Sequence, residues 1–154
     1  MSAPARDPHL TDPRLLDDET VLVRWRSSRA TYWRDHAAMG AIGIVGAMVV
    51  LFLLGKPDQA PVGAIGVMLG IGVRAVYLAS EQLSAEWLLT DRRLLGPQGR
   101  IVPLRDLAAV RPVLSDVQLV TTGGDKHLMK HMADRNAVIA RIEAQRSKRK
   151  KAKR

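Results

Sequence analysis

The most apolar part of the chain is a pair of stretches, residues 37–54 and 61–73, with only six residues between them. The first stretch has eighteen residues and no charge. An α-helix needs about 20 apolar residues to cross about 30 Å of hydrocarbon, so this stretch is close to the required length. The second stretch reaches the required length if the long Arg74 side chain extends to the interface and residues 75–80 complete the span. The pattern therefore predicts an antiparallel hairpin of two transmembrane helices, 37–54 and 61–80.

Charged residues around the two stretches predict the orientation of the hairpin. Arginines cluster at the ends that are remote from the loop, whereas the loop has only Lys56, which Asp58 offsets. Cytoplasmic segments next to membrane helices carry an excess of Lys and Arg. We therefore expect a multi-pass membrane protein with both termini in the cytoplasm and the loop on the far side of the membrane. The arginines are Arg24, Arg26, Arg29, Arg34, Arg74, Arg92 and Arg93, and the aromatic residues expected at the same interface are Trp25, Tyr32, Trp33 and Tyr77.

A soluble domain that buries two helices is the alternative to a membrane hairpin. The mean hydropathy of the whole chain, −0.05, is compatible with such a domain. Two adjacent uncharged helices of this length are nevertheless rare in a small soluble chain, so we favour the hairpin.

After the hairpin the sequence changes to short β-like runs that are separated by turn residues. Glycines within 96–99 and at 123–124 mark two tight turns, where glycine supplies a positive φ. Asp134 then precedes apolar residues at helical spacing and can cap a helix there. The pattern predicts about six antiparallel strands followed by one amphipathic helix. The β-like runs are residues 86–89, 93–95, 100–102, 107–113, 117–121 and 127–129.

Several of these segments resemble the membrane-anchored bacterial PH-domain proteins. In that family an acidic and hydrophobic lead, a two-helix hairpin and a β-rich body follow one another in this order. The similarity extends from about Asp17 to Ile142. Family members related to photosynthetic-complex assembly proteins share the architecture. The segments that carry the resemblance are residues 18–22, 24–32, 87–95, 99–110 and 117–124.

The resemblance implies a membrane α + β protein, in which a two-helix transmembrane hairpin precedes a small PH-like antiparallel β domain with a C-terminal helix. The chain then divides into four parts. They are a cytoplasmic N-terminal segment (1–36), the hairpin (37–80), the cytoplasmic PH-like domain (84–145) and a basic tail (146–154).

Small residues on both apolar stretches indicate close helix packing. Gly66 and Gly70 form a GxxxG pattern in the second stretch, and Gly43 lies in the first. Such glycines let two helix backbones approach each other in lipid. They either pack the hairpin against itself, which we favour, or form a docking face for another membrane subunit.

The basic character of the chain is concentrated in its tail. The formal net charge is +9, but the last nine residues, RSKRKKAKR, contain seven of the 24 basic residues. The remaining 17 basic residues face 15 acidic ones, an excess of two. The tail can bind anionic phospholipids, contact nucleic acid or stay solvated. Nucleic acid is an unlikely partner because no aromatic residues interleave with the charges. The expected lipid-headgroup ligands are Arg74, Lys148, Arg149, Lys150 and Lys151.

Residues with catalytic or ligating potential do not form a recognisable site in the sequence. The chain has no cysteine, and none of its four histidines (His9, His36, His127 and His131) has further ligands at a known metal spacing. Ser27, Ser28 and Ser115 have no evident His or Asp partner. Asp17, Asp18 and Glu19 precede a strand, where we expect a solvated cap. We therefore predict no catalytic residue, no metal and no cofactor, and a protein that is not an enzyme.

Two functional hypotheses follow. The first is an accessory, scaffold or assembly subunit of a larger membrane complex, photosynthetic or respiratory, that contacts other subunits through its hairpin and its PH-like domain. The alternative is a peripheral sensor of anionic lipid headgroups, which uses the PH-like domain and the polybasic tail.

Overall fold

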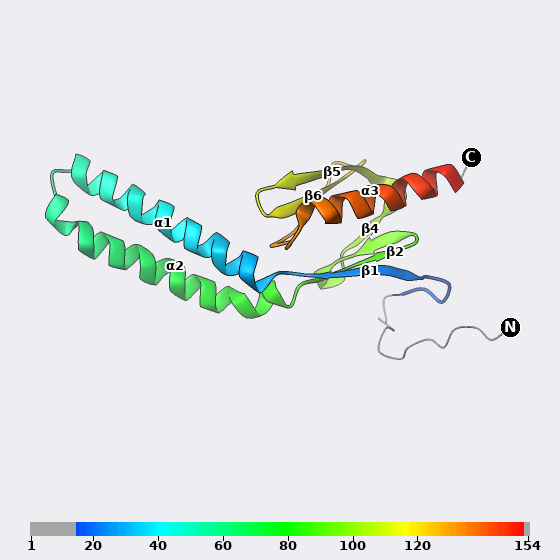
Figure 1. The fold of residues 1–154 in the computed structure, drawn as a ribbon, viewed down its shortest axis with the longest axis horizontal. Helices are drawn as coiled ribbons and strands as arrows, with labels where there is room; N and C mark the ends of the chain where they lie inside the picture. Colours follow the sequence, from blue (N-terminus) through cyan, green and yellow to red (C-terminus); the bar gives the residue numbers. More distant parts are fainter. Residues whose placement is uncertain (1–14, 153–154) are drawn as a thin grey trace.

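A helical hairpin at one end and a β-structure at the other form an elongated molecule (Figure 1). A computed structural model describes residues 15–152. The hairpin consists of α1 (Arg29–Leu53) and α2 (Ala60–Leu83), with a short 3₁₀ turn, η2 (Pro57–Gln59), in the loop. Within residues 15–152, these helices are long and apolar enough to cross a membrane. Only 6% of the most apolar window of each is buried by the chain itself, which opposes the alternative of a soluble domain around two buried helices.

Both helices extend beyond the apolar stretches that predicted them. α1 begins at Arg29 instead of residue 37, because Ser28 caps it there by accepting the N–H of Thr31 at 3.3 Å. Its 25 residues span about 37 Å, so the first turns reach beyond a hydrocarbon layer of about 30 Å. α1 ends at Leu53, and Gly55, just after the C-cap residue Leu54, takes the left-handed conformation (φ +69°). Hydrophobicity marked the apolar part of each helix, but not its polar extension.

The β-structure is made of two antiparallel sheets. One has the order β1-β2-β3-β4 and the other β5-β6-β7. All six strands expected after the hairpin are present. The strands are β1 (Val21–Arg26), β2 (Glu86–Thr90), β3 (Arg93–Leu95), β4 (Ile101–Pro103), β5 (Leu107–Val113), β6 (Asp116–Thr121) and β7 (Lys126–Met129). Two short 3₁₀ turns, η3 (Pro97–Gly99) and η4 (Leu104–Asp106), flank β4.

β1 lies before the hairpin in sequence but pairs with β2 after it. Val21, Val23 and Trp25 alternate with exposed neighbours, so this strand has one face toward the core. The ladder runs from Val21 opposite Thr90 to Arg26 opposite Glu86. We had assigned this strand to a separate N-terminal segment, 1–36. The structure instead makes it part of the four-stranded sheet.

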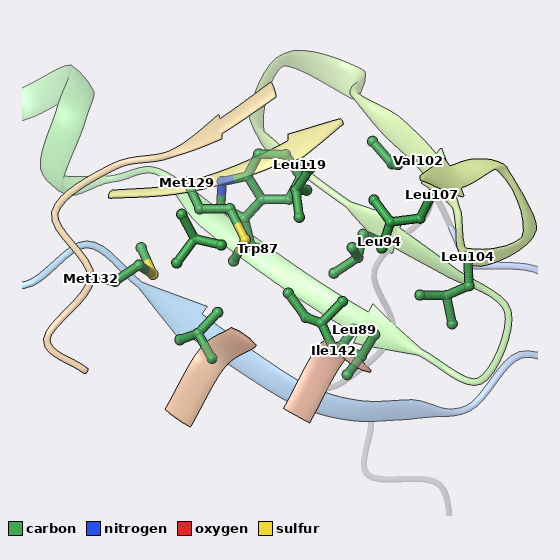
Figure 2. Packing of buried hydrophobic residues seen from close by; sticks show 12 residues of the cluster. Trp87, Leu89, Leu94, Val102, Leu104, Leu107, Leu119, Met129, Met132 and Ile142 are labelled. Atoms are coloured by element: carbon green, nitrogen blue, oxygen red, sulfur yellow. The ribbon is translucent and has the colours of Figure 1, made fainter. Parts of the chain in front are cut away.

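A single apolar core joins the two sheets and the last helix, α3 (Arg135–Ala152) (Figure 2). Trp87 is 1% exposed and lies at the centre of this core, against Gly96 of the neighbouring turn. Asp134 caps α3 as predicted, since its carboxylate accepts the N–H of Ala137 at 3.0 Å. The core residues are Trp87, Leu89, Leu94, Val102, Leu104, Leu107, Val117, Leu119, Met129, Met132, Val138 and Ile142.

The basic tail continues α3 instead of forming a separate segment. The predicted apolar positions end near Ala144, but the helix runs to Ala152. Two arginines hold the extension to the β-structure: Arg146 donates to the carbonyl of Ala108 at 3.0 Å and Arg149 to that of Asp91 at 3.2 Å. α3 points away from the hairpin (Figure 1), and residues 153–154 lie outside the described part.

Candidate functional site

The hairpin is inserted into the turn between two paired strands. α1 follows β1, and α2 precedes β2, after short connections on each side. The backbone N–H of Ser27 donates to the carbonyl of Ala85 at 3.4 Å, and that of Ser28 donates to the carbonyl of His131 at 2.8 Å. The β1–β2 ladder therefore leads directly into the two helices. We call this junction of ladder and hairpin, around Ser27, Ser28 and Ala85, the joint, and the segment after β7 contacts it through His131.

Tyr32 holds the two helices together at this joint. Its side chain is fully buried, and its hydroxyl donates to the carbonyl of Ala75 in α2 at 2.5 Å. The ring packs edge-on against His131, with 5.0 Å between ring centroids. We expected Tyr32 in an interfacial aromatic belt, and this was wrong, because the joint encloses it. Trp33 and Tyr77 are exposed at 47% and 80%, as residues of such a belt would be.

A polar network connects α1, α2 and the β-structure beside Tyr32. Asp35 accepts a hydrogen bond from Ser115 at 2.9 Å, and its second oxygen lies 3.0 Å from Nδ1 of His131. The Nε2 atom of the same ring lies 3.0 Å from the side-chain oxygen of Gln82. The backbone N–H of His131 donates to Asp116 at 2.9 Å. Sequence reasoning missed this network, because its members are far apart along the chain.

Ser115, Asp35 and His131 do not form a nucleophilic triad. In a triad the hydroxyl faces an imidazole nitrogen, and the carboxylate orients the other nitrogen. Here the hydroxyl of Ser115 faces the carboxylate of Asp35, and Gln82 occupies the second nitrogen of His131. The arrangement can position the helices, but it does not activate the serine.

The other histidines and serines singled out in the sequence have structural partners. His127 lies on β7 and His131 in the following turn, so their spacing of four does not place them on one helix face. His36 contacts the backbone carbonyl of Tyr32 at 2.9 Å, and Ser27 donates to that of Lys130 at 3.0 Å. His9 lies outside the described residues. Within residues 15–152, no three His, Asp or Glu side chains come together as metal ligands.

The acidic lead contains a buried ion pair. The Glu19 side chain has no exposed surface and lies 2.7 Å from Nη2 of Arg93. Thr90 also donates to it at 2.7 Å, and the N–H of Leu16 at 3.2 Å. Burial raises the pKa of Glu19, but these hydrogen bonds and the charge of Arg93 outweigh burial and lower it below the ordinary value of 4.5. The expectation of a solvated cap was therefore wrong for Glu19. Its side chain instead connects the acidic segment before β1 to the turn between β2 and β3.

The hairpin uses some of its glycines and leaves others open. A Cβ atom on Gly43 would lie 2.9 Å from Val67, and one on Gly63 would lie 2.8 Å from Leu51. These two glycines let α1 and α2 approach closely. A Cβ atom on Gly66 or Gly70 would meet nothing within 4 Å. The GxxxG pair therefore does not pack the hairpin, contrary to the interpretation that we favoured from the sequence.

The expected lipid ligands are not brought together. Arg74 is exposed on α2, next to Ala75 at the joint. The other four belong to the end of α3, which Figure 1 shows at the opposite end of the molecule from the hairpin. Just before α3, the backbone N–H of Met132 donates to the backbone carbonyl of Ser115, and the hydroxyl of Ser115 donates to Asp35 on α1. α3 therefore starts near the hairpin, and its 18 residues extend about 27 Å away from it. The tail thus lies far from the joint. These four residues are Lys148, Arg149, Lys150 and Lys151.

Comparison with protein-family models, with curated proteins and with solved structures gives no match for this chain. The resemblance to the membrane-anchored bacterial PH-domain proteins therefore stays a prediction.

Proposed function

We propose that the protein is a non-catalytic accessory or scaffold subunit of a larger bacterial membrane complex. Its hairpin spans the inner membrane with both termini in the cytoplasm, and its β-structure is a PH-like domain held at the membrane surface. Two apolar helices that the chain leaves uncovered, and two sheets closed by a C-terminal helix, support this proposal. The joint around Tyr32 supports a scaffold, because His131, after β7, contacts Tyr32 and lies within hydrogen-bond distance of Asp35 on α1 and Gln82 on α2, which ties the β-structure to the hairpin.

The observation that carries the proposal is the open glycine face of α2. Gly43 and Gly63 already supply the close contact within the hairpin, so Gly66 and Gly70 are free to receive another helix. Helices associate in lipid mainly by packing and not by hydrophobic burial, so a small-residue surface is the feature that a partner helix needs.

Leucine substitutions on the two glycine surfaces test this proposal. Gly66→Leu combined with Gly70→Leu adds bulk only to the open face. We expect normal abundance but loss of comigration with a complex in blue-native electrophoresis after mild detergent extraction. The control, Gly43→Leu, places side-chain atoms against Val67 and should lower the abundance of the protein itself. Unchanged comigration of the double variant at wild-type abundance would contradict the proposed docking face.

The alternative of a lipid sensor is less well supported, because four of its five expected headgroup ligands lie at the end of the molecule that is remote from the hairpin. Charges interact over about 8 Å at physiological ionic strength. The end of α3 lies about 27 Å from the start of that helix beside the joint. Of the expected lipid ligands, only Arg74 is near the membrane part of the chain. Its exposure and its place toward the cytoplasmic end of α2 suit contact with lipid phosphates.

A further inference from the structure

A groove of about 470 Å³ lies at the end of the molecule that is remote from the hairpin. The end of α3 forms one wall, and η4 with the start of β5 forms the other. Arg105 lines it from η4, and Arg146, Arg149 and Lys150 line it from α3. Leu104 and Leu107 adjoin the groove but belong to the core and are each only 2% exposed, whereas Ala108, which also lines it, is exposed. The groove could not be predicted from the sequence, because its walls come from separate parts of the chain.

The charges of the groove are largely uncompensated. Arg149 is anchored by a backbone carbonyl, which orients its guanidinium without neutralising it. Arg146 forms a partly exposed ion pair with Glu143 at 3.3 Å and also donates to the carbonyl of Ala108. Arg105 has only an exposed contact with Asp106 at 3.5 Å. Among residues 15–152, no carboxylate lines the groove itself. An anionic group would therefore find arginines already held in place, which reduces the entropy lost on binding.

The lining also specifies more than a negative charge. The exposed side chain of Ala108 and the aliphatic stems of the lining arginines offer apolar contact beside the charged groups, so the best ligand carries both an acid and an apolar side chain. The lining has no aromatic residue on which a nucleobase could stack. The bilayer that would hold the hairpin is at the other end of the molecule.

We infer that this groove binds an acidic, partly apolar peptide segment of a partner subunit. The inference rests on the proposed function, because it places a second contact with the same complex on the cytoplasmic side. The hairpin would then hold its partner in the membrane, while the groove holds an acidic segment of a cytoplasmic part.

The test uses two double variants with the same loss of charge. Arg149→Gln with Lys150→Gln changes the groove, whereas Lys148→Gln with Lys151→Gln changes the same turns of α3 outside it. The full-length protein in detergent is titrated against a fluorescein-labelled peptide in which Glu and Leu alternate, with fluorescence anisotropy as the readout. We expect the groove variant to weaken binding by roughly tenfold or more, and the control variant by less than about threefold.

A further variant and a second peptide define the nature of the ligand. Arg105→Gln, on the other wall, should also weaken binding and does not depend on the integrity of α3. A peptide of alternating Glu and Ser should bind less tightly than the Glu–Leu peptide. Far-UV circular dichroism confirms that each variant is folded.

Three results would overturn the inference. Equal weakening by both double variants would show diffuse attraction to the tail. Equal binding of the Ser and Leu peptides would remove the apolar part of the recognition. Stronger competition by vesicles of anionic phospholipid or by single-stranded RNA than by the unlabelled peptide would assign the groove to another ligand. Each of these leaves the glycine test of the proposed function intact, because Gly66 and Gly70 lie in the hairpin.

Discussion

Replacing Glu19 by Gln should destabilise the β-structure far more than the same change at an exposed ion pair. The substitution keeps the volume and one acceptor oxygen, which can still receive the hydroxyl of Thr90. It removes the charge that faces Arg93 and the second oxygen, which now binds both Nη2 of Arg93 and the N–H of Leu16.

The size of the effect follows from burial. Removing one partner of a buried ion pair costs about 3–5 kcal/mol, because the other charge loses its compensation. Glu19 has no exposed side-chain surface, but Arg93 is 16% exposed, so water reaches part of the guanidinium. We therefore expect the lower end, about 3 kcal/mol of the free energy of unfolding. The control, Glu86→Gln, concerns a carboxylate bound by Arg24 and Arg26, which are 31% and 73% exposed, and should cost less than about 1 kcal/mol.

Urea unfolding of the protein in detergent measures both variants. Trp87 is 1% exposed in the core and reports loss of the β-structure by its fluorescence. A Trp33→Phe background removes the signal of an exposed tryptophan on α1. Similar losses for Glu19→Gln and Glu86→Gln, or a loss below about 1 kcal/mol for Glu19→Gln, would refute the reasoning from burial.

The pH dependence gives an independent check on Glu19. Its pKa is lowered in the folded protein, so its stabilising contribution is complete above the ordinary value of 4.5 and is lost as the pH falls through the lowered pKa. The wild-type protein should therefore lose stability below about pH 4.5, while Glu19→Gln should lose less over the same range. Parallel curves for the two proteins would contradict the assigned pKa shift.

Two further predictions concern the core and the topology. Gly96→Ala should cost about 1–3 kcal/mol in urea unfolding, since its Cβ would lie 2.7 Å from the Trp87 ring, whereas Gly123→Ala has its nearest atoms at 3.8 Å and should be nearly neutral. In whole cells, Asp58→Cys should react with a membrane-impermeant maleimide, and a C-terminal reporter should be accessible only after lysis. A C-terminus that is labelled in intact cells would reverse the proposed orientation.

The sequence predicts those parts of this fold that depend on local pattern. The hairpin was visible because α1 and α2 each contain a long uncharged run, and the strands because apolar residues alternate between turns. The cap at Asp134 could be predicted from the residues that directly follow it. Helix ends were less well predicted, because α1 and α3 continue through polar residues whose helical state depends on capping and on distant contacts.

Features that depend on distant residues could not be read in this way. Glu19 appears solvated until Arg93, 74 positions later, is placed beside it. The GxxxG motif specifies a surface but not its direction, so the choice between hairpin packing and an open face required the backbone of both helices. The joint around Tyr32 combines residues from opposite halves of the chain, and the basic groove combines η4 and β5 with the end of α3, which follows them only after two further strands.

The insertion of the hairpin between β1 and β2 determines the order in which the protein can form during synthesis. β1 leaves the ribosome first, but its partner strand follows only after residues 27–85, which take roughly 3–12 s at about 5–20 residues per second. Both helices are thus complete before the first sheet can close, so under the proposed function membrane insertion would precede folding of the β-structure. A fragment that starts at Ser84 would lack β1 and expose the edge of β2, which favours aggregation. The β-structure of this protein is therefore complete only when the whole hairpin has been made.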